Sequence, residues 1–74
     1  MPPVEEHRIR CHLEHLLEEK ELTLVELSTL VGISVANLSI LKNNRAKAVR
    51  FSTLTALCEV LECTPGELFG LDKD

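Results

Sequence analysis

Residues 23–43 read TLVELSTLVGISVANLSILKN, and their spacing predicts two short helices joined by a tight turn. Thr23 with Glu26 three residues later is a capping pair that satisfies two free amides at a helix start. Gly32 readily takes the left-handed conformation that ends many helices. Ser34, two residues further on, is a favoured cap for the next helix. We therefore expect one helix to end at Gly32 and another to begin directly after Ser34.

Small and apolar residues stand where a steep crossing of these helices requires them. Ser28 leaves room at the crossing, and Ile33 and Leu38 are expected to be buried beneath the turn. If Leu38 and Leu41 point inward, the helix that runs to about Asn43 turns its other side outward. The pattern is that of a helix-turn-helix, whose second helix commonly enters the major groove of DNA.

The other periodic segments are also expected to be helical, because no stretch shows sustained alternation of β-branched residues. We expect a first helix over Val4–Lys20 and a fourth over Thr53–Leu61 capped by Ser52. A short fifth helix should open with the capping pair Thr64 and Glu67. A chain of 74 residues holds a single core, so the prediction is one all-α domain over residues 1–74.

Charge is segregated along the chain. No acidic residue lies between Glu26 and Glu59, and four of the eight Lys/Arg residues lie in that gap. The middle of the chain is therefore basic although the formal net charge is −4, and a local basic patch attracts polyanions. Asn37 occupies the position where the helices capped by Thr23 and Thr64 have Glu, so nothing acidic offsets the positive end of the third helix. We expect a phosphate to approach that end.

The outward side of the third helix and the loop after it form the candidate DNA-binding surface. Apolar side chains there are expected to meet thymine methyl groups and polar ones base edges. The predicted base contacts are Val35, Ala36, Asn37, Ser39 and Ile40. The predicted contacts to backbone phosphates are Ser34, Lys42, Asn43, Asn44, Arg45, Lys47 and Arg50. The alternative is a solvated basic loop beside ordinary exposed apolar residues.

From about Arg10 to Leu71 the sequence resembles the small stand-alone helix-turn-helix regulators of the phage-repressor and Cro type, the xenobiotic-response-element family. The resemblance rests on the stretches ANLSILK (36–42), FSTL (51–54), LC (57–58) and CTPGEL (63–68). It implies a lambda-repressor-like fold of five helices, with the third in the major groove of double-stranded DNA. Two residues depart from the pattern: Leu24 replaces a frequent phosphate-binding Gln, and Asn44 replaces the Gly that usually ends the recognition helix.

Together the charge pattern and the resemblance predict a sequence-specific DNA-binding transcriptional regulator, expected to be a repressor. The resemblance also implies a homodimer on a two-fold symmetric operator. We expect its interface at Leu61, Phe69 and Leu71, with the first helix as the second choice. The alternative function is a protein-interaction module, antitoxin-like or an adaptor, that uses the apolar outward side of the third helix. Only DNA binding should weaken steeply with salt.

No feature of the sequence indicates an enzyme, a cofactor or a small-molecule ligand. Three cysteines without a C-x-x-C pair fit free thiols in a reducing compartment. His7, Cys11 and His15 would share one face of the expected first helix, but a small apolar Cys between solvated His residues is the simpler interpretation, so we expect no metal. The sequence shows neither a signal peptide nor an apolar run of membrane-spanning length. The expected location is cytoplasmic.

Overall fold

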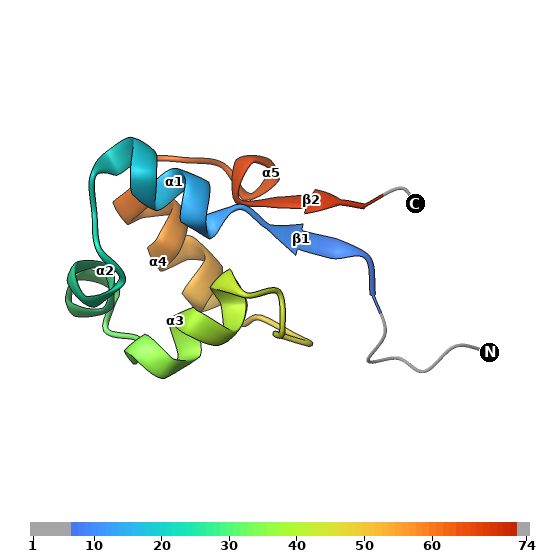
Figure 1. Ribbon diagram of the computed structural model, residues 1–74, viewed down its shortest axis with the longest axis horizontal. Helices are drawn as coiled ribbons and strands as arrows, with labels where there is room; N and C mark the ends of the chain where they lie inside the picture. Colours follow the sequence, from blue (N-terminus) through green and yellow to red (C-terminus); the bar gives the residue numbers. More distant parts are fainter. Residues whose placement is uncertain (1–6, 73–74) are drawn as a thin grey trace.

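The computed structural model describes residues 7–72, which form five helices and a two-stranded sheet (Figure 1). In chain order the elements are β1 (Ile9–Cys11), α1 (Leu13–Lys20), α2 (Leu24–Val31), α3 (Val35–Lys42), α4 (Phe51–Leu61), α5 (Pro65–Leu68) and β2 (Phe69–Leu71). The two strands lie side by side at one end of the molecule, and α2 lies at the opposite end. The first and last described segments therefore meet.

The core is built from leucine. Among the described residues every buried hydrophobic side chain is a leucine, and all five helices contribute at least one. These are Leu13, Leu16, Leu17, Leu27, Leu38, Leu41, Leu57, Leu61 and Leu68. Leucine retains high helix propensity while filling the space between crossing helices, so a small domain gains both from one residue type.

Three helix starts are as predicted from local sequence. Thr23 and Thr64 each open a helix with a reciprocal capping box, and the Ser34 hydroxyl accepts a hydrogen bond from the amide of Asn37 at the start of α3. Gly32 ends α2 in the left-handed conformation, with φ 72°. These signals act over three or four residues, so they do not depend on the rest of the fold.

The expectation of a purely all-α chain is wrong at the two ends of the described chain. Ile9 pairs with Leu71 and Cys11 with Phe69 in an antiparallel ladder, so the first helix begins at Leu13 instead of extending upstream. Its expected start at residues 4–6 lies outside the described residues. His12, just before α1, makes no side-chain cap; its backbone N–H donates instead to the carbonyl of Leu68 at 2.7 Å.

The fourth helix also begins earlier than predicted. Arg50 is its N-cap, and the amide of Leu54 closes the first turn on the Arg50 carbonyl at 3.0 Å. Ser52 therefore lies inside the helix instead of capping it. Arg50 makes no side-chain cap, and the side chain of Phe51 is 86% exposed at the helix start.

Candidate nucleic-acid interface

The turn between α2 and α3 has the geometry of a helix-turn-helix. The two helices are bent by 117° relative to each other, within the range typical of this motif. Ser28 does more than leave room at the crossing, because its hydroxyl donates to the Ile33 carbonyl at 2.6 Å and ties α2 to the turn. Leu27 and Leu38 are fully buried on the two sides of the crossing. The orientation of α3 is thus determined by packing and by one partly buried hydrogen bond.

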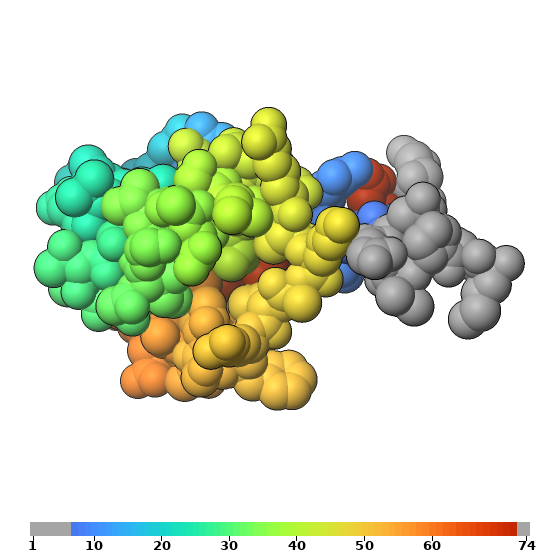
Figure 2. Space-filling model, turned by 90° about the horizontal axis from the view of Figure 1, so that it is seen from below, coloured from blue at the N-terminus to red at the C-terminus, as the bar shows by residue number. Residues whose placement is uncertain are grey.

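The outward side of α3 is the one that the sequence predicted. Leu38 and Leu41 are buried, whereas Val35 and Ile40 are 39% and 44% exposed. The other predicted base contacts differ in exposure: Ala36 and Asn37 are exposed, whereas Ser39 is half-buried. Figure 2 looks onto this face, where α3 and the segment after it lie next to each other and the start of α4 adjoins them.

A groove of about 650 Å³ runs between α3 and the segment that leads to α4. Its lining includes Ser34 and Asn37 at the positive end of α3, and Arg45, Lys47 and Arg50 from the segment. Among the residues that the structure describes, none that lines the groove is acidic, and the first turn of α3 contains no acidic residue. The groove therefore combines three cationic side chains with an unopposed helix N-terminus, an arrangement that attracts anions.

The cations beside this groove differ from two cations elsewhere on the described chain, Arg10 and Lys20, which are paired with carboxylates. Arg10 is paired with Asp72 at 3.1 Å and Lys20 with Glu62 at 3.2 Å. Within residues 7–72, none of the ion pairs includes Arg45, Lys47 or Arg50. Lys42, at the last turn of α3, is half-buried and is likewise outside these ion pairs. The positive charge of the groove is not neutralised from within this part of the molecule.

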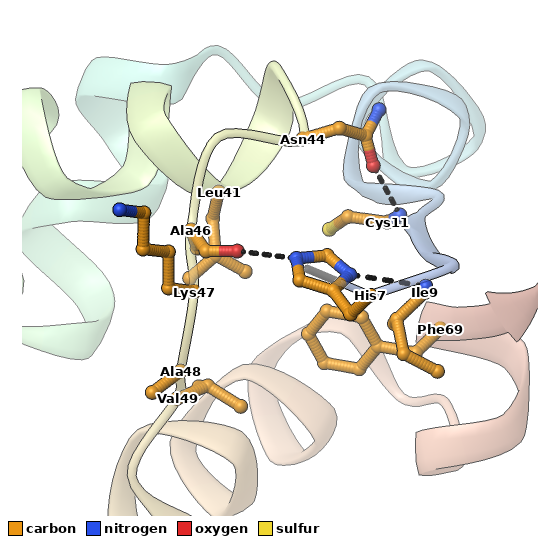
Figure 3. Close-up of a pocket in the computed structure, with 10 residues that line it drawn as sticks. All are labelled: His7, Ile9, Cys11, Leu41, Asn44, Ala46, Lys47, Ala48, Val49 and Phe69. Atoms are coloured by element: carbon orange, nitrogen blue, oxygen red, sulfur yellow. Dashed lines mark hydrogen bonds between the residues drawn. The ribbon is translucent and has the colours of Figure 1, made fainter. Parts of the chain in front are cut away.

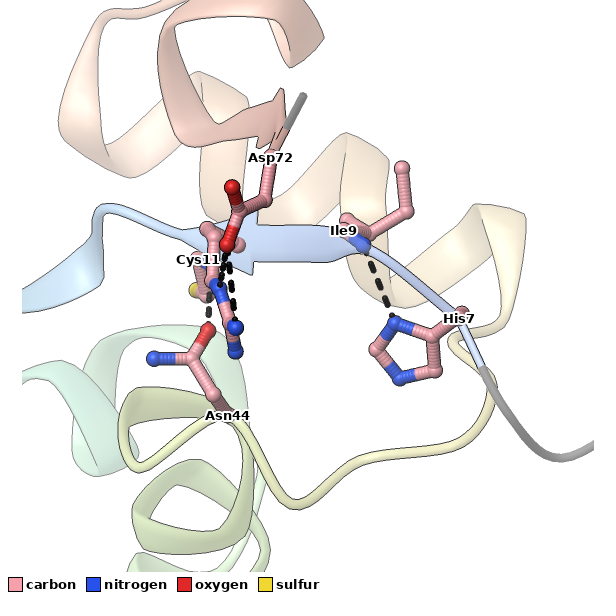
Figure 4. A network of polar contacts seen from close by, with 6 residues as sticks. His7, Ile9, Cys11, Asn44 and Asp72 are labelled. Atoms are coloured by element: carbon pink, nitrogen blue, oxygen red, sulfur yellow. Dashed lines mark hydrogen bonds and ion pairs between the residues drawn. The ribbon is translucent and has the colours of Figure 1, made fainter. Parts of the chain in front are cut away.

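Asn44 ends the third helix in the left-handed conformation that its position requires, with φ 61°. The amide of Arg45 bonds to the Ile40 carbonyl and that of Asn44 to the Leu41 carbonyl, which is the Schellman closure of a helix. The side-chain oxygen of Asn44 accepts a hydrogen bond from the Cys11 amide at 2.7 Å (Figure 4). Asn44 is one of the predicted phosphate contacts. Its side-chain oxygen is engaged in this bond, so only its NH₂ group remains to donate to another acceptor.

His7 makes a second link between β1 and the segment after α3, and nothing in the sequence indicated it. Its Nε2 donates to the Ala46 carbonyl at 2.9 Å, and its Nδ1 accepts from the Ile9 amide at 3.1 Å (Figures 3 and 4). A neutral ring with its proton on Nε2 makes both bonds at once. The basic segment is therefore held against β1 at two points, Asn44 and Ala46.

Two other side chains on this surface bond to each other. The Nδ2 of Asn43 donates to the hydroxyl oxygen of Ser39 at 3.2 Å across one turn of the helix end. Because the Ser39 hydroxyl accepts in this bond, the bond does not use its hydrogen. Leu24 is half-buried and packs against the core, which accounts for an apolar residue where the resembling family often has Gln.

Two earlier expectations change with these positions. The sequence predicts Leu61 in a dimer interface; this is wrong, because Leu61 is fully buried in the core and is not available to a partner. Two exposed apolar residues lie on the two-stranded sheet: Leu71 is 56% exposed and Ile9 is 41% exposed. They are directly opposite each other in the antiparallel pair. The expected placement of His7, Cys11 and His15 on one helix face is also wrong, because only His15 lies on α1.

Within residues 7–72, no single helix is both long enough and apolar enough to cross a membrane; α2 and α3 reach that length only together, across their sharp bend.

Comparison with known proteins agrees with this geometry. A family model described as a Cro/C1-type HTH DNA-binding domain matches residues 12–74. The Bacillus subtilis (strain 168) protein named "Uncharacterized HTH-type transcriptional regulator YozG" is 48% identical over 66 residues, which are 89% of this chain and 79% of that protein. The crystal structure of transcriptional regulator VanUg, Form II, is similar with a TM-score of 0.74 and 27% identity, and the match covers 93% of this chain and 92% of that one. Because the family model matches most of the chain and α2 and α3 form the bent pair of a helix-turn-helix, this protein belongs to the family of Cro/C1-type helix-turn-helix DNA-binding domains.

Proposed function

We propose that this protein regulates transcription by sequence-specific binding to double-stranded DNA, as a homodimeric repressor with α3 in the major groove. The observation that carries the proposal is the outward side of α3, which lies beside a groove with three cations. Within residues 7–72 these cations are in no ion pair, and none of the residues that line the groove is acidic. The family membership supports DNA as the polyanion, and the names of the two relatives support regulation of transcription.

In this account the outward side of α3 reads the bases. Val35, Ala36 and Ile40 present apolar groups of the size that packs against thymine methyls. Asn37 carries both a donor and an acceptor, which suits an adenine edge, and Ser39 has its hydroxyl hydrogen available. These five side chains supply the sequence dependence of binding.

The groove and both ends of α3 bind the phosphate backbone of DNA. Ser34 with the first-turn amides of α3 takes one phosphate, and the remaining contacts come from the segment that follows α3. They are made by Lys42, Asn43, Asn44, Arg45, Lys47 and Arg50. Such contacts set the register of the protein on the duplex and supply most of the affinity for any sequence.

The small size of this surface supports a dimer, and the small size of the protein supports repression by occupancy. One helix of eight residues contacts few base pairs, so useful specificity calls for two copies on paired half-sites about one helical turn apart. A protein of this size bound over a promoter blocks access by occupancy alone, which requires no further contact.

Selection of bound sequences from a random duplex library tests the proposal. We expect enrichment of a two-fold symmetric site whose half-sites are centred about 10 base pairs apart. The charge-reduced variant Arg45→Ala/Lys47→Ala should recover no site from the same library, while Lys20→Ala, which removes a paired lysine on α1, should recover the parent site. Absence of any enriched sequence would refute sequence-specific binding, and an enriched site without symmetry would refute the dimer.

A further inference from the structure

A second, apolar pocket lies on the other side of the segment that carries the basic groove (Figure 3). Its volume is about 340 Å³, in the range of pockets that hold small molecules. The walls come from β1, the end of α3, the following segment and β2, and are formed mainly by Ile9, Cys11, Leu41, Ala46, Val49 and Phe69.

Several polar groups around this pocket already bond to one another. His7 donates to the Ala46 carbonyl and accepts from the Ile9 amide, and the Cys11 amide donates to Asn44. Burial raises the pKa of the Cys11 thiol, which therefore stays uncharged at neutral pH. A charged ligand would lose hydration here without gaining a partner, whereas an apolar ligand needs none.

One stretch of chain separates the two hollows. Leu41 and residues 46–49 line both the apolar pocket and the basic groove. Figure 3 shows the Lys47 side chain extending to the opposite side of this stretch from His7. A molecule that fills the pocket would therefore press on the backbone that positions Lys47 and leads to Arg50.

We propose that this pocket binds an uncharged, mainly apolar small molecule of one or two rings, and that its occupancy changes the affinity of the basic groove for DNA. Binding in the pocket stands on the pocket's own walls. The effect on DNA rests on the proposed function, and by linkage DNA must change the affinity for the small molecule by the same factor.

Titration of the ¹⁵N-labelled protein with 2-naphthol tests the first half without DNA. We expect saturable amide shifts at residues 9–11, 46–49 and Phe69. Ala48→Leu, which adds bulk to the pocket wall, should weaken 2-naphthol binding at least tenfold, and Ala36→Leu, the same change at an exposed alanine outside the pocket, should leave it unchanged. If Ala48→Leu does not fold, Ala46→Leu serves in its place. Shifts that do not saturate, or equal binding by the filled and control variants, would overturn the site.

The second half is tested by the Kd for the selected operator duplex with and without saturating 2-naphthol. We expect a change of at least threefold in the parent and none in Ala48→Leu. An unchanged Kd in the parent, with the naphthol bound, would overturn the coupling and leave the pocket standing. Failure to bind any duplex would refute the proposed function and with it the coupling, whereas the amide shifts would still decide the pocket.

Discussion

The side-chain oxygen of Asn44 lies 2.7 Å from the backbone nitrogen of Cys11, and this hydrogen bond joins the end of α3 to the first strand of the sheet. Asn44 does this while holding a left-handed backbone. Asn44 thus ends α3, begins the basic segment and accepts a hydrogen bond from a backbone amide of β1. Because His7 adds a second link at Ala46, the sheet is a support for the candidate DNA-binding surface.

Variants of Asn44 should separate its two roles. Asn44→Gly keeps the left-handed conformation but loses the side-chain bond, which we expect to lower the free energy of unfolding by about 1 kcal/mol. Asn44→Ala loses the bond and is strained at positive φ, so its loss should be about 2 kcal/mol. Urea denaturation of both variants measures the order. If Asn44→Gly is as stable as the parent, the link to Cys11 contributes nothing to the fold.

Gly32→Ala isolates a purely conformational cost. A Cβ built at Gly32 meets no atom within 4 Å, so no clash contributes. The left-handed backbone at φ 72° should still cost about 1 kcal/mol in unfolding free energy. Thermal and urea unfolding check the value. A loss well above 2 kcal/mol would mean that the turn has a packing role that the open space around it does not show.

Leu38 and Ile40 should give mutants that differ in kind. Leu38 is fully buried, so Leu38→Ala should destabilise the domain by about 2 to 5 kcal/mol and reduce DNA binding only by unfolding it. Ile40 is 44% exposed, so Ile40→Ala should keep the fold and lose about 1 kcal/mol of binding at one base pair, most simply a thymine. Melting curves and a panel of single-base operator variants give the comparison. If Ile40→Ala binds every operator variant with the same affinity as the parent protein does, Ile40 does not read sequence.

Removal of charge from the groove should act on all DNA sequences alike. Arg45→Ala, Lys47→Ala and Arg50→Ala should each weaken binding to operator and random duplex by similar factors, because phosphates are the same everywhere. If cations neutralise about three phosphates per protomer, the log-log salt slope of a dimer should be roughly −5, and each variant should flatten it by about 1.8. Lys20→Ala, whose lysine is paired with Glu62, is the matched control and should keep the parent slope. A parent slope near zero would favour the protein-interaction module.

Local signals in the sequence were sufficient for much of the fold and for the phase of α3. The caps at Thr23, Ser34 and Thr64 each act within one turn, and Leu38 with Leu41 determines which side of α3 faces out. The strands were not predictable in this way, because each has three residues, too few for alternation to be visible. Their partners also lie about sixty residues apart along the chain.

The misassigned residues have similar physical causes. Ser52 is a good cap by type, but the first turn of α4 closes on the Arg50 carbonyl, and a backbone acceptor has no signature in sequence. The same holds for the bond from His7 to Ala46. Leu61 suited both an inward face and an interface, and only the packing of α4 against the other helices showed that the core takes it completely. The parts of the site that depend on tertiary contacts were thus the parts that the sequence could not supply.

The central claim is that α3 and the segment after it meet DNA, and an NMR titration of the ¹⁵N-labelled protein with its selected operator duplex tests it most directly. We expect the largest amide shifts at residues 34–50, with small shifts in α1 and α5. Large shifts confined to the sheet or to α1, with α3 unchanged, would contradict the account.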